Sequence, residues 1–294
     1  MSSIILKRPA RGPMVLLNKA DLDILYFIWR WKMATTRLIQ ISCFKNMNLH
    51  KVYVKLLRLE KYGFIEILPR VERDFIAWKL TKKGFTVLLE NLEAFRNYKS
   101  DDGFGIEHCR HDFLVTAFHF GDWCLTCPQN VELVTEQEMR RFAEKELPDW
   151  VPPVTSHRPD GYTKINSSDI NHVIAIEVEL NIKSEDDNFK AFKFYSEMKE
   201  VTQVLWLVSD ERLMEKLKKQ MKLRRVPNQN IHSFVMLDDF LVNQSKANVI
   251  SELKTPVSLR NYYETILGTT PVTIAEQQLN YSAQMTYFRP AKKY

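Results

Sequence analysis

The sequence has few cysteines and glycines and no long apolar run. Four Cys among 294 residues are too few for a fold held together by disulfides. With only 8 Gly and 12 Pro, the collagen-like, mucin-like and disordered classes are excluded. No stretch reaches the roughly 18 apolar residues of a membrane span. At the start, a basic pair follows a very short apolar run, the reverse of a secretory signal, so we expect a cytoplasmic protein.

Positive charge is concentrated in the first third of the chain. The net charge is +6 overall, whereas residues 1–99 contain 19 Lys and Arg against 8 Asp and Glu. The remaining residues contain 23 basic and 28 acidic side chains. A basic first third followed by a mildly acidic remainder favours a polyanionic partner for the first third, and we expect DNA. A basic face without any partner is the alternative.

The first third has the pattern of a winged helix-turn-helix domain, which we expect over residues 15–96. Helical periodicity begins after Asn18, again near Thr35, and again from about Asn48 to Lys61, where Gly63 follows as a stop signal. Two strand-like segments, 64–68 and 75–80, flank a polar connection, and a last helix begins near Thr81. Winged helices also serve as protein-docking modules, but the basic charge favours DNA.

The third helix of this domain is the expected recognition element. Its exposed polar side chains can reach phosphates and base edges in a major groove, and two arginines lie where the wing tip would contact the backbone. The predicted DNA-binding residues are Lys45, Asn46, Asn48, His50, Lys51, Lys55, Arg58, Arg70 and Arg73.

An α/β domain is expected after a polar linker at residues 97–106. Helical and strand-like segments alternate from residue 107 to about residue 240, which is typical of an α/β sandwich with a mixed central sheet. Residues 241–294 are less periodic, with one short helix expected at 261–267 and a loose basic tail. The predicted fold class is therefore α/β with two domains, the first a winged helix.

Three carboxylates mark the second domain. Residues 171–180 read as a strand on which Glu177 and Glu179 share one face, about 7 Å apart along the backbone. If the segment after Pro159-Asp160-Gly161 pairs with this strand, Asp160 meets both glutamates. Such a group repels itself unless a cation neutralises it, and hard oxygen ligands suit Mg²⁺ or Mn²⁺. The alternative is that the glutamates pair with Lys183 or Lys190, or face solvent.

These residues resemble a known motif. Asp160, followed at a spacing of 17 residues by Glu177-Val178-Glu179, resembles the PD-(D/E)XK restriction-endonuclease-like motif, with Glu179 where that motif has lysine. A winged helix followed by His157-Arg-Pro-Asp160 and then Glu-x-Glu is similar to the replication-relaxation family. Within it, the chain resembles the MOBC-type relaxases of mobilisable plasmids, over roughly residues 18–225.

The resemblance implies a relaxase, an enzyme that nicks one DNA strand at a transfer or replication origin. It implies that Asp160, Glu177 and Glu179 hold the metal and that His157 acts as acid, base or nucleophile. Possible accessory residues are His111, Lys183 and Lys190. The implied partners are origin duplex, the nicked single strand, an accessory mobilisation protein and a coupling protein.

Three alternatives remain open. A degenerate nuclease-like domain would make the chain a non-catalytic DNA-binding regulator, which the missing motif lysine favours. A replication initiator could use the same chemistry as a relaxase. A zinc site could form from His108, Cys109, His111, Cys124 and Cys127, since Cys124 and Cys127 have ligand spacing, but ordinary buried thiols account for the cysteines better.

Overall fold

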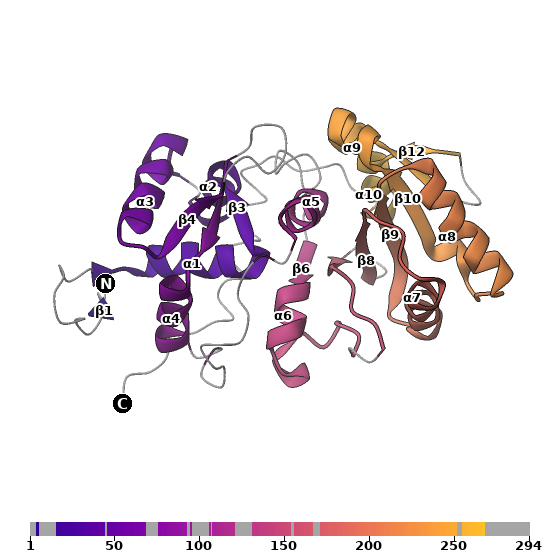
Figure 1. Cartoon of the computed structure of the whole chain (residues 1–294), viewed down its shortest axis with the longest axis horizontal. Coiled ribbons are helices and arrows are strands. Elements are labelled where there is room, and N and C mark those ends of the chain that lie inside the picture. Colours follow the sequence, from indigo (N-terminus) through magenta and orange to yellow (C-terminus); the bar gives the residue numbers. More distant parts are fainter. Residues whose placement is uncertain are drawn as a thin grey trace. The chain divides into compact units, whose positions relative to one another are not determined.

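The computed structural model describes most of the chain as two compact units. The described residues are 4–5, 16–44, 46–68, 76–92, 95, 106, 108–120, 131–153, 156–166, 171–251 and 255–267. The division between the units falls between Phe113 and Leu114, inside helix α5 (Cys109–His119). Figure 1 draws both units, each of which is described by itself here.

The first unit is a winged helix. Its helices and strands alternate as α1 (Lys19–Trp31), β3 (Met33–Thr35), α2 (Thr36–Cys43), α3 (Leu49–Lys61), β4 (Ile65–Leu68), β5 (Ala77–Leu80) and α4 (Lys82–Asn91). The three strands form an antiparallel sheet in the order β3-β5-β4. Two further short strands, β1 (Ile4–Ile5) and β2 (Leu16–Leu17), pair with each other.

Polar caps fix where these helices begin. Asn18, Thr35, Asn48 and Thr81 each accept a hydrogen bond from the backbone N–H three residues on, which satisfies an otherwise unpaired donor. At the other end of α3, Gly63 has a φ of 73°, which a glycine adopts without strain. The helix starts predicted from sequence are therefore confirmed. The short strand β3 was not predicted, because three residues between two helices leave no readable alternation.

The core of the first unit is aromatic. Trp29, Phe85 and Phe95 are buried and meet edge to face, with the Trp29 and Phe95 ring centroids 4.6 Å apart. On the sheet, the buried Trp78 donates from Nε1 to Thr36 Oγ1 at 2.9 Å. These contacts join α1, α2, α4 and the sheet around one centre.

The second unit is built on a seven-stranded mixed sheet in the order β12-β11-β10-β9-β8-β7-β6. The β6-β7-β8 pairs are antiparallel, the β8-β9-β10 pairs are parallel, and the β10-β11-β12 pairs are antiparallel again. The strands are β6 (Val131–Thr135), β7 (Gly161–Asn166), β8 (Asn171–Glu179), β9 (Val201–Val208), β10 (His232–Met236), β11 (Asn248–Ser251) and β12 (Val257–Ser258).

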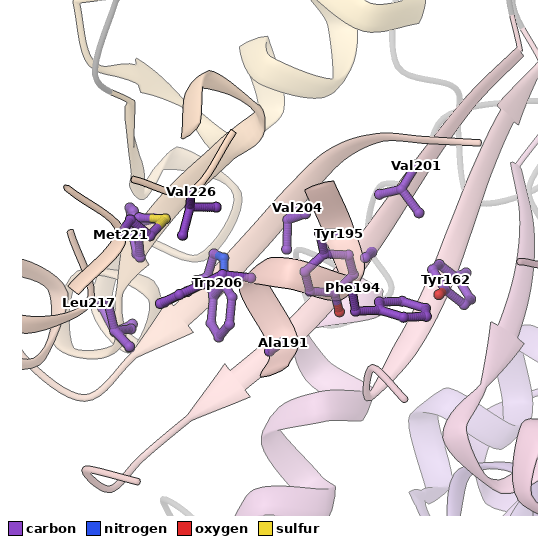
Figure 2. Close-up of a cluster of buried hydrophobic side chains, with 14 of the residues drawn as sticks. Tyr162, Ala191, Phe194, Tyr195, Val201, Val204, Trp206, Leu217, Met221 and Val226 are labelled. Atoms are coloured by element: carbon purple, nitrogen blue, oxygen red, sulfur yellow. The ribbon is translucent and has the colours of Figure 1, made fainter. Parts of the chain in front are cut away.

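Helices pack on both faces of this sheet. They are α6 (Glu136–Arg141), α7 (Glu185–Glu197), α8 (Glu211–Leu223), α9 (Leu237–Asn243) and α10 (Leu259–Leu267), together with the end of α5. Figure 2 shows one face, where Tyr195 of α7 and Leu217 of α8 pack against Tyr162 and Trp206 of the strands. Thr163, which alternates with Tyr162, faces His119 of α5 on the other side. The predicted α/β class with a mixed central sheet is confirmed.

The sheet continues beyond the end expected for the second domain. Residue 240 falls inside α9, and β11 and β12 extend the sheet past it. The short helix expected at residues 261–267 forms as part of α10. These strands have only two to four residues, so their sequence carries little periodic signal. Within the described ranges, no helix combines the length and the apolar character needed to cross a membrane.

Candidate functional site

Asp160, Glu177 and Glu179, here called the carboxylate cluster, meet at one end of the β7-β8 pair. Asp160 immediately precedes β7, and its backbone N–H donates to Ile176 of β8 at 3.1 Å. Its side chain then turns toward β8, where Oδ2 accepts from the Val178 N–H at 2.7 Å. The Asp160 carboxylate is thus fixed against the backbone of the residue that separates the two glutamates.

The glutamates point to the sheet face that α7 covers. Both are only 4% exposed, and β9 places Trp206 and Val208 beside them in register. The Tyr195 hydroxyl, from α7, donates to Glu177 Oε1. His157 Nε2 lies 2.6 Å from the same oxygen. Glu177 is therefore held by two side chains that come from outside its own strand.

Lys183 closes the other side of the cluster. Its Nζ lies 2.6 Å from Glu179 Oε2, while half of its side chain stays exposed. Sequence comparison with the PD-(D/E)XK motif left Glu179 at the position of the usual lysine. The structure brings a lysine to the cluster from four residues further along the chain, in the segment between β8 and α7.

The pKa values of these groups reflect a surplus of negative charge. Burial raises the pKa of Glu179, and the charges of Glu177 and Asp160 add to the rise against the opposing Lys183. Burial alone would lower the pKa of Lys183, but the surrounding carboxylates outweigh burial and raise it. The pKa of His157 is raised in the same way, mainly by Glu177. Perturbed groups gathered like this are typical of functional sites.

The donor chemistry of the cluster suits a divalent cation, but its present geometry does not form a cation site. Carboxylate oxygens are preferred ligands of Mg²⁺ and Mn²⁺. However, each of the three carboxylates already accepts a hydrogen bond or an ion pair from another group of the protein. Across the described part of the chain, no group of three or more His, Cys, Asp or Glu side chains is placed to hold a metal ion. A cation would therefore have to displace a present partner of Glu177 or Glu179.

A histidine that the sequence did not single out supports the cluster from behind. A Cβ built on Gly161, the residue after Asp160, would lie 2.3 Å from His119 Nε2 and 2.9 Å from the Val134 carbonyl oxygen. Only glycine fits this close approach, which explains the Pro-Asp-Gly sequence. Tyr195 also escaped prediction as a functional residue, because an aromatic at helical spacing reads as core.

The predicted DNA-binding residues of the first unit divide into two groups. His50 and Lys51 are exposed on α3, and Asn46 is exposed just before it, whereas Asn48 caps the helix. Lys55 and Arg58 both point to the buried Asp21 of α1. The remaining three predictions, Lys45, Arg70 and Arg73, lie outside the described residues.

The exposed side of α3 is also apolar, which the sequence analysis did not anticipate. Its exposed apolar side chains, between 37% and 50% accessible, are Leu49, Tyr53, Val54 and Leu57. Tyr53 lies with its ring centroid 6.1 Å from that of Trp78 on the wing sheet. The face predicted to read DNA therefore combines few cations with several apolar groups.

Of the expected accessory residues, Lys183 contacts the carboxylate cluster, whereas His111 and Lys190 have other partners. His111 belongs to the first unit, where its Nδ1 lies 3.6 Å from Asp112 Oδ1. Lys190 is exposed on α7 and pairs with Asp187 at 3.4 Å. Of the zinc alternative, Cys109 is a free thiol, while Cys124 and Cys127 lie outside the described residues.

Comparison with known proteins finds one distant structural match. No family model and no curated protein sequence matches the chain. One solved structure, the restriction endonuclease FokI bound to DNA, is similar at 11% sequence identity with a TM-score of 0.26. The match covers 75% of this chain and 43% of that one. The chain thus spans less than half the length of the structure it matches.

Proposed function

We propose that this chain is a DNA endonuclease that nicks one strand at a plasmid transfer or replication origin. The observation that carries the proposal is the carboxylate cluster, with Lys183 and His157 bound to it, at one end of the β7-β8 pair. A winged helix with a strongly basic sequence precedes this site in the same chain. That combination supplies a means of docking on duplex DNA and a polar site for phosphodiester chemistry.

In this proposal Asp160, Glu177 and Glu179 would hold Mg²⁺ or Mn²⁺ once the cation displaces a present partner of Glu177 or Glu179. When bound, such an ion activates water and polarises the phosphate. Lys183, half-exposed beside Glu179, donates to a phosphate oxygen and offsets charge that develops there. His157 carries a proton to or from the reacting oxygens. Tyr195 acts through Glu177, whose carboxylate it holds in place.

The relaxase resemblance supplies the finer part of the proposal. It favours origin duplex and the nicked single strand as nucleic-acid partners, with an accessory mobilisation protein and a coupling protein as protein partners. A replication initiator with the same chemistry differs only in the origin that it nicks. Both versions require the same site residues and divalent ions.

One observation favours a second function, a DNA-binding regulator without catalysis. Each carboxylate of the cluster is bound by a group of the protein itself, so the three side chains keep their positions without a metal. The apolar side of α3 would then dock a protein, and the second unit would serve as scaffold. This function predicts DNA binding in the absence of any metal-dependent cut.

The two functions are separated by a nicking assay with the full chain. The probe is a supercoiled plasmid that carries the DNA flanking the chain's own gene, incubated with Mg²⁺, with Mn²⁺ or with EDTA. Asp160→Ala and Glu177→Gln should slow nicking by about a hundredfold or more, because metal ligands and their partners are this sensitive to loss. Duplex binding should stay near that of the wild type.

Glu197→Gln is the matched control, since Glu197 is an exposed glutamate of α7 that pairs only loosely with Lys193, at 3.8 Å. It should nick as the wild type does. If Asp160→Ala and Glu177→Gln both nick at the wild-type rate, the site assignment is wrong. If the wild type binds this plasmid but never nicks it with either ion, the regulator replaces the enzyme.

A further inference from the structure

Helix α8 and the residue that follows its C-cap form a basic surface that the proposed site does not use. Six of the ten residues from 216 to 225 are Lys or Arg, and none is acidic. The basic surface consists of Arg212, Lys216, Lys219, Lys222 and Arg225. All five are exposed except Lys216, which is half-buried. This charge lies in the part of the sequence whose overall balance is acidic.

The two sides of α8 are sharply different. Its apolar side chains, among them Leu217 and Met221, pack into the core against the sheet, as Figure 2 shows. Arg212, Lys216 and Lys219 follow each other at spacings of four and three residues, so they lie on one side of the helix. From Arg212 to Lys222 the surface extends about 15 Å along the helix axis.

Few acidic groups neutralise this surface. Glu215 lies on the same side of α8, but Lys218 already pairs with it at 3.0 Å. Arg224 pairs with Asp186 of α7 at 3.3 Å. Among the described residues, no carboxylate lies within ion-pair distance of Lys216, Lys219 or Arg225. The surface therefore keeps a net positive charge that an external polyanion can neutralise.

The C-terminal part of α8 contacts the start of α7. Asn188 of α7 donates to Gln220 of α8 at 2.9 Å, and the Arg224 guanidinium lies over the Phe189 ring. Lys183, which binds the carboxylate cluster, is in the segment directly before α7. The helix that carries the basic surface thus packs against the helix that follows Lys183.

We propose that α8 binds the sugar-phosphate backbone of DNA, as a second contact besides the winged helix. This inference rests on the proposed function for the choice of DNA as the polyanion. A row of cations about 15 Å long, in which Lys216 and Lys219 have no carboxylate partner among the described residues, matches several consecutive phosphates of one strand. A membrane surface fits less well, because helices that bind membranes present their apolar side to the lipid and α8 buries that side in the core.

The test is the salt dependence of DNA binding by the full chain. The probe is a fluorescently labelled 30-base-pair duplex from the same flanking DNA, titrated in EDTA between 50 and 200 mM NaCl. Each lysine that contacts a phosphate adds about one to the slope of log affinity against log salt concentration. The variant Lys216→Gln/Lys219→Gln/Lys222→Gln should therefore reduce that slope by about three.

The matched control is Lys145→Gln/Lys199→Gln/Lys246→Gln, which removes the same charge from three exposed lysines scattered over the second unit. Its slope should stay within about one of the wild type. Equal slopes for both triple variants would overturn the proposal. Wild-type binding to phosphatidylserine vesicles that only the α8 variant loses, with its DNA slope unchanged, would overturn it in favour of a membrane surface.

The outcome is independent of whether the chain cuts DNA. All binding measurements contain EDTA, and none uses a variant of the carboxylate cluster. A chain that never nicks but shows the expected loss of slope would keep the α8 contact and overturn the enzyme. A chain that nicks through Asp160 but shows no loss of slope would keep the enzyme and overturn the α8 contact.

Discussion

Both compact units bury carboxylates, and they differ in how those charges are balanced. In the first unit, Asp21 of α1 is fully buried and accepts from Arg58 on one oxygen and from the Asn18 N–H on the other. Lys55 of α3 adds a second cation at 3.7 Å. In the second unit, Asp160, Glu177 and Glu179 lie together, and Lys183 and His157 pair with the two glutamates.

The difference is one of electrostatic balance. Two cations of α3, Lys55 and Arg58, face the single negative charge of Asp21, and this pairing joins α1 to α3. The carboxylate cluster brings three acidic side chains together, and the raised pKa of Glu179 shows that burial and like charge oppose its ionised form in spite of Lys183. Such an arrangement adds little to the stability of a fold, and perturbed groups of this kind are common at functional sites.

The largest effect expected from this comparison is on stability, from the same isosteric change made in each unit. Asp21→Asn should lower the free energy of unfolding of the first unit by about 2–3 kcal/mol. An amide accepts only on its oxygen, so its NH₂ group would face either the Arg58 guanidinium or the Asn18 N–H, both of which are also donors. Glu179→Gln should leave the second unit as stable or make it more stable, because it removes a like charge. Calorimetry of the full chain in EDTA resolves the transitions.

The partial exposure of Arg58 places the Asp21→Asn cost at the low end for a broken buried pair. Glu66→Gln serves as the control, since Glu66 pairs with Lys79 on the exposed wing and should shift unfolding very little. A loss of stability for Glu179→Gln as large as that for Asp21→Asn would remove the distinction between the two regions.

The winged helix could be predicted from sequence because its signals are local. Helix starts are indicated by N-cap side chains that bond within the first turn, and these belong to Asn18, Thr35, Asn48 and Thr81. The strand β8 and its alternation were readable for the same reason. Because alternation fixes which residues share a face, the proximity of Glu177 and Glu179 followed directly.

The partners of these residues could not be predicted, since they depend on packing between distant segments. Nothing near Arg58 in the sequence reveals that Asp21, 37 residues earlier, binds its guanidinium. The same holds for Tyr195 at Glu177 and for His119 behind Gly161, which are brought together only when α7 and α5 cover the sheet. Exposed apolar residues on α3 read as core because they share the helical period.

A smaller effect on stability is expected from alanine substitution of one glycine in each unit, Gly161 and Gly63. Gly161→Ala should lower the stability of the second unit by about 1–2 kcal/mol, because the new methyl group overlaps His119 and the Val134 carbonyl. Adding His119→Ala should recover part of the loss. Gly63→Ala meets no atom within 4 Å, so its cost, about 1 kcal/mol, comes from the backbone angle alone and has no second-site rescue.

These glycine effects are read from shifts of the unfolding midpoint of each unit. If the losses of stability from Gly161→Ala and His119→Ala simply add in the double variant, the backbone has moved at Gly161 to accommodate the methyl group. His119 would then not define the position of Asp160. The nicking rate of Gly161→Ala should fall along with its stability, because a shift of the backbone at Gly161 also moves the adjacent Asp160.

The smallest effect, and the one that divides the two regions most directly, is their opposite response to pH. Burial would raise the pKa of Asp112 in the first unit, but His111 and Lys32 outweigh it and lower the pKa. A lowered carboxyl pKa stabilises the fold above its unfolded value of about 3.9, and this contribution is lost as pH falls through the folded pKa.

In the second unit, Glu179 and His157 both have raised pKa values. Their contributions are present at low pH and are lost as pH rises, above about 4.3 for Glu179 and above about 6.5 for His157. Between pH 5 and 8 in EDTA, the Glu179 and His157 contributions to the second unit should therefore decline, while the Asp112 contribution to the first unit stays constant. Burial lowers the pKa of His232 in the second unit to about 3, which acts in the opposite direction, so calorimetry compares the slope of the wild type with that of each variant. Glu179→Gln and His157→Asn should each flatten the decline. If both variants keep the wild-type slope, the surplus charge of the cluster does not act on the fold, and the contrast with Asp21 fails.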